Sequence, residues 1–289
     1  MPFSSLSPQN WPFGLEWLPE TAYLVGGAVR NAFLSGSTEQ EYLDLDFVLP
    51  TEPVETARKI ARHYGVGFVL LDPERQIARV VFREATVDFA PQVGENLVKD
   101  LQRRDFTVNA IAYNPKIEAI IDPLGGRLDL KRGVMRMVAK TNLKDDPLRL
   151  LRAYRQAAQL NFTIDPLTRA TIRSLAGQLG TVAAERVQTE LGYLLKKETG
   201  NKWLAEAYRD GLFQSWLVNV TPEKLQQVAK IDAAANMMIA TWPQLNNYYP
   251  SCLKTAKLAS LVSQKPSEAE VELLKLKYSR AEIRSVVTA

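Results

Sequence analysis

The sequence predicts an α+β protein, in which a small mixed β-sheet with helices is followed by a part made of helices alone. Two observations support this prediction. In the first half, short segments that are apolar, or that alternate between apolar and polar residues, are separated from helix-like segments by turn residues. After about residue 144, apolar residues recur at helical spacing and no strand is predicted.

The elements of the first half follow these patterns in order. Tyr23–Val25 is a short apolar strand, and Gly26–Gly27 separates it from the helix-like segment Ala28–Leu34. Tyr42–Leu49 alternates with period two and is predicted to be a strand. Val54–Tyr64 has its apolar residues on one side, as an amphipathic helix does. The later predicted strands are Val66–Leu71, Ile77–Phe82, Thr86–Phe89, Ala110–Tyr113 and Ala119–Ile121.

In the second half, the predicted helices are separated by residues that end or start helices. These breaks are Asp165–Pro166, Gly177–Gly180, Thr221–Pro222, Trp242–Pro243 and Lys265–Pro266. The change from mixed to helical structure predicts a domain boundary near Ala139–Lys144.

The composition excludes several classes of chemistry. The chain has 289 residues, of which 46% are hydrophobic, enough for two domains. Its one cysteine, Cys252, excludes a disulfide scaffold and a cysteine zinc site, and fits a reducing compartment. Its one histidine, His63, excludes a histidine-rich metal site. Acid–base or metal chemistry must therefore come mostly from carboxylates.

Charge and hydropathy indicate a location and a kind of partner. No apolar run approaches the roughly 20 residues of a membrane span, and the N-terminus lacks the order of a signal peptide, so we expect a soluble, cytoplasmic protein with no membrane partner. The net charge of +4 is uneven: residues 1–143 hold 16 basic and 18 acidic residues, and the remainder holds 20 and 14. The basic half suits a polyanion partner, or is an ordinary solvated helical surface.

A glycine pair lies between the first strand and the first helix. Gly26 and Gly27 have no Cβ, so backbone N–H groups can approach an anion there. Arg30, one turn into the helix, can reach back to the same anion. The alternative is a plain strand-to-helix turn with a surface arginine. The dinucleotide fingerprint G-x-G-x-x-G is absent.

Two acids lie two residues apart on the next strand. Asp44 and Asp46 therefore point to one face, and their apolar neighbours point to the other. Adjacent carboxylates repel each other unless a cation or a shared proton lies between them, and Mg²⁺ is the natural cation for oxygen ligands beside phosphates. Asp88, in a later strand, is a candidate third metal ligand. The alternative is a pair of solvent-facing acids on an edge strand.

Five segments carry a resemblance to a known family. They are, in chain order, Leu24–Arg30 with Asp44–Asp46, then Asp100–Ala110, Asp122–Leu130, Asp145–Arg155 and Glu185–Leu191. The series resembles the ordered motifs of the class II tRNA nucleotidyltransferase and bacterial poly(A) polymerase family, part of the polymerase-β-like nucleotidyltransferase superfamily. The resemblance implies a nucleotidyltransferase head followed by an all-α neck and body.

The resemblance also implies roles for the matching residues. Asp44 and Asp46 would be catalytic and would hold Mg²⁺. The other positions would bind the nucleotide: Gly26, Gly27, Arg30 and Arg104 the triphosphate, Asp105 and Asn109 the sugar, Asp146 and Arg149 the base, with help from Arg152 and Arg155. Without the resemblance, Arg103–Asp105 is a surface ion-pair cluster and Arg149–Arg155 a basic amphipathic helix. Glu185–Leu191 is interpreted as structural, an acid and an arginine that tie helices together.

The sequence departs from the family pattern at several places. Asn31 follows Arg30 where the family usually has Asp, and the fourth motif begins with Asp145 rather than Glu. Only 11 residues, Phe89 to Lys99, separate Asp88 from Asp100. CCA-adding members usually have a longer flexible loop there, so the short segment favours a CC-adding enzyme.

We therefore predict an N-terminal extension over residues 1–22, a catalytic head over 23–140, a nucleotide-selecting neck over 141–200 and a helical body over 201–289. That body is short for the family, as a truncated or a compact natural form would be. The implied function is template-independent addition of nucleotides from CTP and/or ATP to the 3′ end of tRNA. The alternatives are a full CCA-adding enzyme or a poly(A) polymerase, and an inactive RNA-binding protein on the same fold.

Overall fold

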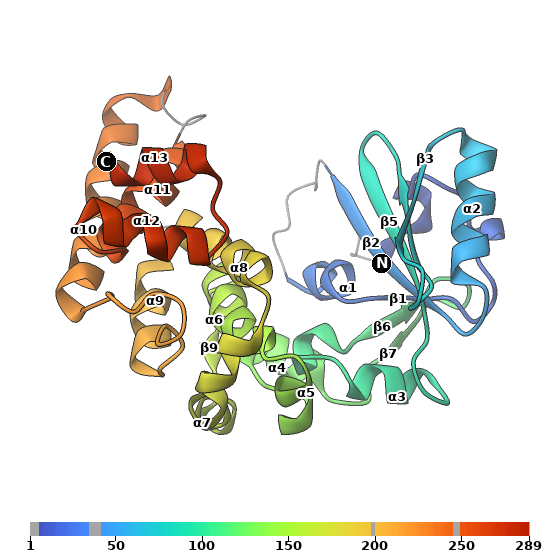
Figure 1. Ribbon diagram of the computed structural model, residues 1–289. Coiled ribbons are helices and arrows are strands. Elements are labelled where there is room, and N and C mark those ends of the chain that lie inside the picture. Colours follow the sequence, from blue (N-terminus) through green and yellow to red (C-terminus); the bar gives the residue numbers. More distant parts are fainter. Residues whose placement is uncertain (1–5, 35–41, 198–199, 245–248, 289) are drawn as a thin grey trace. The chain divides into compact units, whose positions relative to one another are not determined.

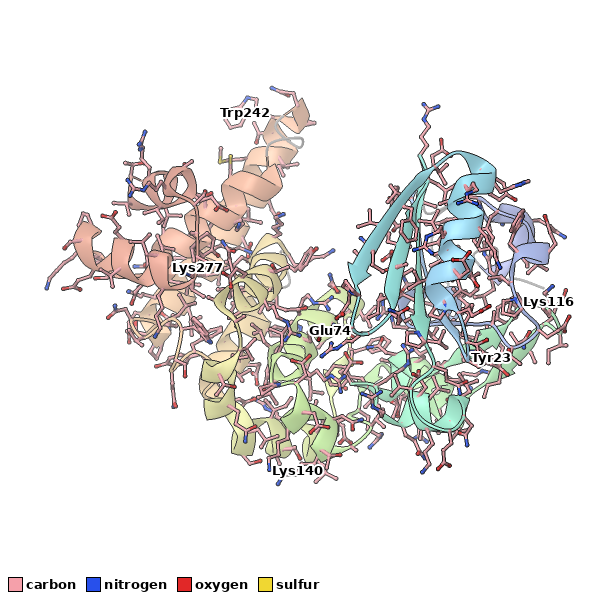
Figure 2. All side chains as sticks on the ribbon, turned by 45° about the vertical axis from the view of Figure 1, so that its right-hand side comes forward. Tyr23, Glu74, Lys116, Lys140, Trp242 and Lys277 are labelled. Atoms are coloured by element: carbon pink, nitrogen blue, oxygen red, sulfur yellow. The ribbon has the colours of Figure 1, made fainter. Side chains whose placement is uncertain are left out.

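The computed structural model describes residues 6–34, 42–197, 200–244 and 249–288. The chain divides into two compact units, Met1–Ala139 and Lys140–Ala289, which are described here one at a time (Figure 1). Lys140, at the start of the second unit, is labelled in Figure 2. The division falls within the region where the pattern of the sequence changes from mixed to helical.

A seven-stranded mixed sheet forms the centre of the first unit, in the order β3-β4-β5-β2-β1-β6-β7. β2 and β5 are parallel, and the other pairs are antiparallel. The strands are β1 (Tyr23–Val25), β2 (Leu43–Leu49), β3 (Gly67–Asp72), β4 (Ile77–Val81), β5 (Ala85–Pro91), β6 (Ala112–Asn114) and β7 (Ala119–Ile121), with a separate two-residue strand β8 (Val134–Met135). The mixed α+β fold is thus confirmed.

The helices of this unit are α1 (Gly27–Ala32), α2 (Pro53–Tyr64), α3 (Leu97–Gln102) and α4 (Gly126–Arg132), with short 3₁₀ turns at Pro8–Asn10, Leu15–Trp17 and Thr107–Asn109. One strand begins later than predicted. The N–H of Ala110 bonds to the carbonyl of Thr107 and closes the last of these turns, so β6 starts only at Ala112.

The first face of the sheet is covered by α2 and by the segment that precedes β1. Along β2, Leu45, Phe47 and Leu49 are all buried on this face. Phe13 lies 6.0 Å from Phe47 and 6.3 Å from Phe89, ring centre to ring centre, and Trp11 lies 5.3 Å from Phe47. The described part of the N-terminal extension is therefore part of the core of this unit; residues 1–5 lie outside the described residues.

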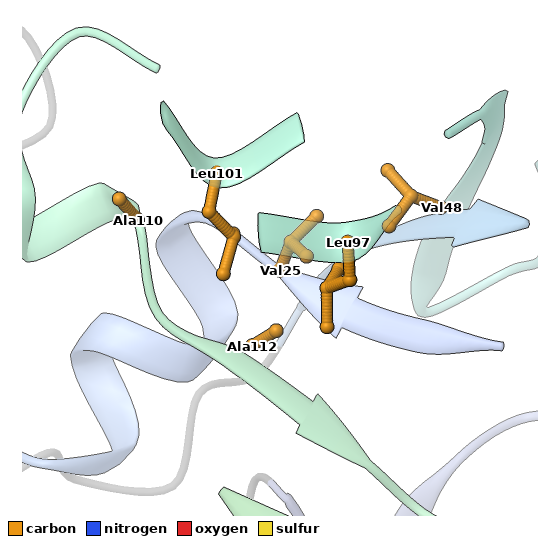
Figure 3. Packing of buried hydrophobic residues seen from close by; sticks show 6 residues of the cluster. All are labelled: Val25, Val48, Leu97, Leu101, Ala110 and Ala112. Carbon is orange, nitrogen blue, oxygen red and sulfur yellow. The ribbon is translucent and has the colours of Figure 1, made fainter. Parts of the chain in front are cut away.

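The second face is covered by α3 at one end of β2. Val48 packs there with Val25 and with Leu97 and Leu101 of α3, beside Ala110 and Ala112 (Figure 3). Asp46 and Asp44 lie on this same face, two and four residues before Val48; Asp46 is half-buried and Asp44 is exposed. The apolar cover thus ends where the acids begin.

The second unit is built of helices with one short exception. They are α5 (Lys140–Asp145), α6 (Leu148–Leu160), α7 (Pro166–Leu175), α8 (Ala184–Lys196), α9 (Gly200–Arg209), α10 (Pro222–Thr241), α11 (Tyr249–Leu261), α12 (Pro266–Lys275) and α13 (Arg280–Val287), with a 3₁₀ turn at Ala176–Thr181. The prediction of no strand is wrong at Thr163–Ile164, the two-residue strand β9. Two residues are too short for a periodic pattern to indicate a strand.

Three of the five predicted breaks mark where helices start. Gly177–Gly180 lies instead within the 3₁₀ turn, and Trp242 directly follows α10. Asp165 caps α7, its carboxylate accepting the N–H of Thr168 at 3.0 Å, and Pro166 is the first helical residue. Thr221 caps α10 in the same way, ahead of Pro222. Proline is favoured at this position because its missing N–H would be unpaired there in any case.

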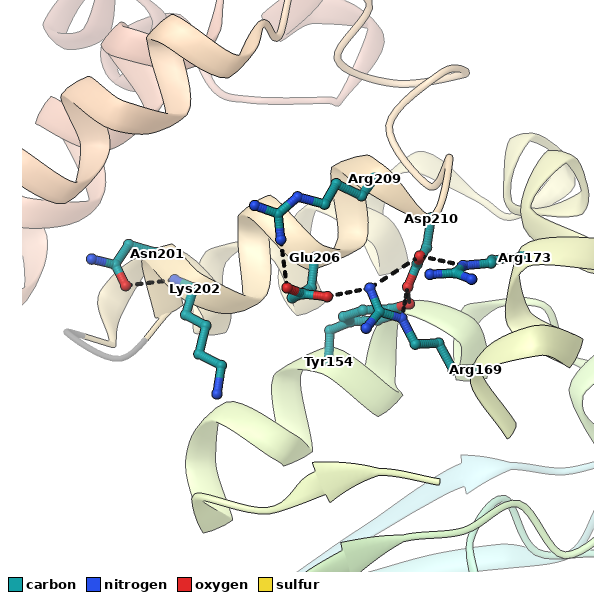
Figure 4. Close-up of polar contacts among 8 residues, drawn as sticks. All are labelled: Tyr154, Arg169, Arg173, Asn201, Lys202, Glu206, Arg209 and Asp210. Atoms are coloured by element: carbon teal, nitrogen blue, oxygen red, sulfur yellow. Dashed lines mark hydrogen bonds and ion pairs between the residues drawn. The ribbon is translucent and has the colours of Figure 1, made fainter. Parts of the chain in front are cut away.

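A buried acid holds part of this unit together. The Asp210 side chain has no exposed surface, and it accepts hydrogen bonds from Arg169, Arg173 and the hydroxyl of Tyr154 (Figure 4). Burial by itself raises the pKa of Asp210, but the three hydrogen bonds outweigh it and leave the pKa below its usual value. Asp210 is thus an ionised anchor that joins α6 and α7 to the end of α9.

Phe13→Ala should lower the free energy of unfolding by about 3–5 kcal/mol, because it opens a cavity among buried aromatic rings. Urea unfolding followed by tryptophan fluorescence measures this change. Ile117→Ala, at a residue that is 69% exposed, is the control and should change stability by less than about 0.5 kcal/mol. Equal effects of the two variants would show that the N-terminal segment does not belong to the core.

Asp210→Asn should lower the free energy of unfolding by about 3–5 kcal/mol at pH 7, because it leaves two arginines facing a neutral partner. Since the pKa of Asp210 is lowered in the folded protein, its contribution is present above its ordinary pKa and is lost as the pH falls through the folded value. The difference between wild type and variant should therefore shrink in acid. Glu268→Gln, in an exposed pair with Lys265, is the control.

Candidate active site

The turn between β1 and α1 brings three parts of the first unit together. Gly26 has φ +73°, a conformation that favours glycine. A Cβ at Gly26 would lie 3.3 Å from Oδ2 of Asp46 and 3.6 Å from Nη1 of Arg104. A Cβ at Gly27 would lie 3.6 Å from Nη2 of Arg30. The structure thus brings an acid, two arginines and the glycine turn together; that they bind a triphosphate stays a prediction.

The two acids of β2 differ in their surroundings. Asp44 is exposed and accepts a hydrogen bond from the Thr86 hydroxyl at 2.8 Å. Burial, and after it the charges of Asp44 and Asp88, raise the pKa of Asp46, while Arg104 and Arg79 lower it; together these effects leave the pKa at about 6. The negative charge at Asp46 is therefore only partly compensated.

This pair of acids fits a divalent cation. Asp44 and Asp46 share one face of β2 and supply carboxylate oxygens, the ligands that Mg²⁺ prefers. A cation between them would remove the repulsion that disfavours ionised Asp46. In the described part of the chain, no group of three or more His, Cys, Asp or Glu side chains is arranged to hold a metal ion.

Asp88 lies beside this pair but is held by an arginine. It pairs in register with Asp46 across the parallel strands β2 and β5. Its two oxygens accept hydrogen bonds from Nε and Nη2 of Arg79, at 2.6 Å and 2.8 Å. The hydrogen bond to Asp88 raises the pKa of Arg79 although burial lowers it. A role for Asp88 as a third metal ligand stays a prediction.

A buried polar chain fixes Arg30. Its Nη1 donates to Asn109 at 2.8 Å, and the Asn109 amide donates to Asp105 at 2.9 Å. Asp105 also accepts the N–H of Phe106 at 2.8 Å. Asp105 and Asn109 are both buried. The structure therefore places the predicted sugar-binding pair directly behind the predicted phosphate-binding arginine; contact with a sugar stays a prediction.

Asn31, the departure from the family pattern, also contacts Arg30. Its side-chain oxygen accepts hydrogen bonds from Nε and Nη2 of Arg30, at 3.1 Å and 3.0 Å. A neutral amide orients the guanidinium without cancelling its charge.

Sequence reasoning missed the roles of Arg79 and Asp100. Asp100 accepts a hydrogen bond from Arg104 at 3.2 Å and another from the N–H of Val93 at 3.0 Å. The spacing of four between Asp100 and Arg104 on a helix was a usable signal. Arg79 could not be assigned, because the register of β4 against β5 is not written in either strand alone.

In the second unit, the predicted base-reading residues lie at the start of α6. Asp146 accepts the N–H of Leu148 on Oδ1 at 3.3 Å and a hydrogen bond from Arg186 on Oδ2 at 2.8 Å. Nη1 of Arg149 donates to the backbone carbonyl of Asn142 at 3.0 Å. Both side chains are thus held by groups of this unit before any nucleotide is bound.

Arg152 and Arg155 differ in their surroundings. Arg152 is half-buried on α6. Nε of Arg155 donates to Glu190 at 2.5 Å, Nη1 donates to Gln159, and the guanidinium lies over the ring of Tyr193. Arg155 therefore ties α6 to α8, and contact with a nucleotide stays a prediction for both arginines.

The segment Glu185–Leu191 has the structural role that the sequence indicated. Two of its residues, one turn apart on α8, each bond to the fourth motif: Arg186 to Asp146, and Glu190 to Arg155. The interpretation of this segment as an acid and an arginine that tie helices together is confirmed.

Adjacent carboxylates beside a glycine turn and arginines, on a mixed sheet followed by helices, suit a class of protein that binds nucleotides together with a divalent cation. Two family profiles match the chain. Residues 82–136 match the Poly A polymerase head domain, and residues 161–223 match the probable RNA and SrmB-binding site of polymerase A.

Characterised relatives agree with these matches. The chain is 52% identical over 284 residues to the CC-adding tRNA nucleotidyltransferase of Synechocystis sp., covering 96% of this chain and 68% of the relative. It is 45% identical over 183 residues to the A-adding tRNA nucleotidyltransferase of Deinococcus radiodurans, covering 62% and 41%. The protein therefore belongs to the tRNA nucleotidyltransferase and poly(A) polymerase family.

Solved structures share the fold. A tRNA nucleotidyltransferase complexed with a primer tRNA and an incoming ATP analog aligns with TM-score 0.78 at 25% identity, over 92% of this chain and 79% of that one. A tRNA-processing enzyme with CTP aligns with TM-score 0.79 at 25% identity, over 91% and 72%. In the described residues, no helix is both long enough and apolar enough to span a membrane.

Asp46→Asn should stabilise the metal-free protein at pH 8 by about 2–3 kcal/mol, because it removes a disfavoured charge. An acid whose pKa is raised by folding, here to about 6, lowers stability above that pH and has no such effect once it is protonated. The gain should therefore fade as the pH drops from 8 to 4.5.

Urea unfolding with a chelator present measures this difference, and Glu74→Gln, at an exposed residue, is the control. Added Mg²⁺ should raise the stability of the wild type at pH 8 and leave Asp46→Asn unchanged. A loss of stability in Asp46→Asn at pH 8 would contradict the assignment.

Proposed function

We propose that this protein adds cytidine residues from CTP to the 3′ end of tRNA without a nucleic-acid template, in a reaction that depends on Mg²⁺. The observation that carries the proposal is the pair Asp44 and Asp46 beside the Gly26 turn, in a chain that is 52% identical to a CC-adding enzyme over 96% of its length. The intact acids favour this function over an inactive RNA-binding protein.

Different residues of the first unit would bind the metal ion, the triphosphate and the sugar. Asp44 and Asp46 would hold Mg²⁺, which, when bound, supplies a positive charge beside the α-phosphate and the tRNA 3′-hydroxyl. Gly26, Gly27, Arg30 and Arg104 would orient the triphosphate through backbone N–H groups and guanidinium donors. Asp105 and Asn109 would hold Arg30 in place and bind the sugar.

Base selection would be the task of Asp146 and Arg149. The Watson–Crick edge of cytosine offers an amino donor and ring acceptors, which match a carboxylate acceptor beside a guanidinium donor. Uracil offers the reverse pattern. Adenine also offers a donor and an acceptor, so these two residues alone admit both CTP and ATP. Arg152 and Arg155 would help to bind the nucleotide.

The short connection from β5 to α3 supports CC addition. β5 ends at Pro91 and α3 begins at Leu97, and Asp100 of α3 accepts the N–H of Val93 between them. The same carboxylate holds Arg104. A connection fastened in this way leaves little chain to rearrange between acceptance of C and acceptance of A. A full CCA-adding enzyme or a poly(A) polymerase remains the alternative.

The domain assignment is part of this proposal. The first unit would be the catalytic head, residues 141–200 the neck that selects the nucleotide, and the described parts of 201–289 a body whose basic surface holds tRNA phosphates. Residues 245–248 and 289 of that body lie outside the described residues. We also place the protein in the cytoplasm, which fits the exposed free thiol of Cys252.

An incorporation assay tests the proposal. It uses labelled CTP or ATP, Mg²⁺ and tRNA that lacks its 3′ CCA. CTP alone should be incorporated, to two residues per tRNA. Addition of CCA would select the full enzyme, and long A tails would select the polymerase. If neither nucleotide is incorporated, the enzyme assignment is wrong.

Asp44→Ala should lower the rate of incorporation by about 10³-fold or more, since it removes a ligand of the cation that stabilises charge in the transition state. Circular dichroism should show an unchanged fold, because Asp44 is exposed. Glu74→Ala, at another exposed acid of this unit, should keep the wild-type rate. A near-normal rate in Asp44→Ala would refute the metal site.

A further inference from the structure

The Asp146 carboxylate is held from two sides by its own unit. Oδ1 accepts the N–H of Leu148, at 3.3 Å, at the start of α6. Oδ2 accepts a hydrogen bond from Nη2 of Arg186, at 2.8 Å, on α8. A carboxylate bonded through each oxygen to a different element cannot rotate freely about its χ angles. Its remaining lone pairs therefore point in fixed directions.

Stability does not account for the contact with Arg186. The Arg186 side chain is 53% exposed and the Asp146 side chain is 30% exposed. An ion pair that is this accessible to water contributes about 0–1 kcal/mol to folding. The pair of Arg155 and Glu190, 15% and 10% exposed, already fastens α8 to α6. The contact of Arg186 therefore adds little to the attachment of α8 to α6.

The position of Arg186 on α8 suits a role in orienting the Asp146 carboxylate as a hydrogen-bond acceptor. Arg186 and Glu190 are four residues apart on α8 and so lie on one side of that helix. Glu190 pairs with Arg155 of α6, and Arg186 reaches the acid at the start of α6. An ionised carboxylate only accepts hydrogen bonds. An acid that must recognise an amino group, and reject a carbonyl, has to remain such an acceptor.

We propose that Arg186 is a positioning residue for base selection, which fixes the Asp146 carboxylate as an oriented acceptor for the amino group of the incoming base. The proposal rests on the proposed function, in which Asp146 reads the base. It assigns to the fifth motif a part in specificity, in addition to its part in holding the helices together.

Steady-state incorporation of CTP and of UTP by Arg186→Ala tests the proposal. The ratio of kcat/KM for CTP to that for UTP should fall about tenfold, because a carboxylate that can turn no longer distinguishes an amino group from a carbonyl. KM for CTP should rise about fivefold, kcat should change less than about twofold, and KM for tRNA should not change. Arg186→Lys keeps the charge and should recover part of the ratio.

Two further variants separate positioning from a general structural effect. In an Asp146→Asn background, Arg186→Ala should change the ratio by less than about twofold, because the residue it positions is already altered. Arg58→Ala removes an equally exposed pair, with Glu55 on α2, and should leave the ratio and both KM values as in the wild type. Equal losses of kcat for CTP and UTP, or full additivity with Asp146→Asn, would overturn the proposal.

Equilibrium binding of CTP and UTP to the same variants keeps this inference separate from the proposed function. A wild-type chain that binds CTP more tightly than UTP but transfers neither would refute the function and still decide the role of Arg186. Loss of that preference in Arg186→Ala supports the positioning role. Retention of the full preference, or a wild type without one, refutes it.

Discussion

The alternation of side chains along β2 is the constraint on which the rest of the first unit depends. One face of this strand carries Leu45, Phe47 and Leu49 into the core, and the other carries Asp44, Asp46 and Val48. A shift of one residue would place the acids among the rings of Trp11, Phe13 and Phe89, where an unpaired charge is very costly. The aromatic core therefore fixes the register that presents the two acids.

Among the described residues, arginines form ion pairs with two other acids around this site, but not with Asp44 and Asp46. Arg79 holds Asp88, and Arg104 holds Asp100. Within the described residues, Asp44 and Asp46 form no ion pair, and the pKa of Asp46 is raised to about 6. The residual negative charge of the site is thus concentrated on one strand. That distribution suits a bound cation.

Local patterns predicted most of this arrangement, and contacts between distant elements account for what they missed. The strand at Tyr23–Val25, the helix up to Tyr64 and the helix starts at Pro166 and Pro222 follow from periodicity and from proline, which act within a few residues. The pairing of Arg79 with Asp88 depends on strand register, and that of Arg155 with Glu190 on helix packing. Neither pairing can be predicted from the local sequence around the two residues that form it. The ordered motifs predicted the family, but not which side chains of a motif face a ligand and which face a neighbouring helix.

Arg155 shows why that distinction matters for selectivity. Spacing alone spreads Arg149, Arg152 and Arg155 over about a third of the circumference of α6, because each step of three residues falls roughly 60° short of a turn. The last of the three has therefore rotated towards α8, where it meets Glu190 and Tyr193. Arg149 lies near Asp146 at the start of α6, and Arg186 of α8 bonds to Asp146 there. A protein that selects a base without a template needs hydrogen-bonding groups as fixed as those of a paired base, and side chains become that fixed only when other side chains hold them. In the proposed function, the helical ties of this unit would thus be as much a part of base recognition as the acid and the arginine that would contact the base.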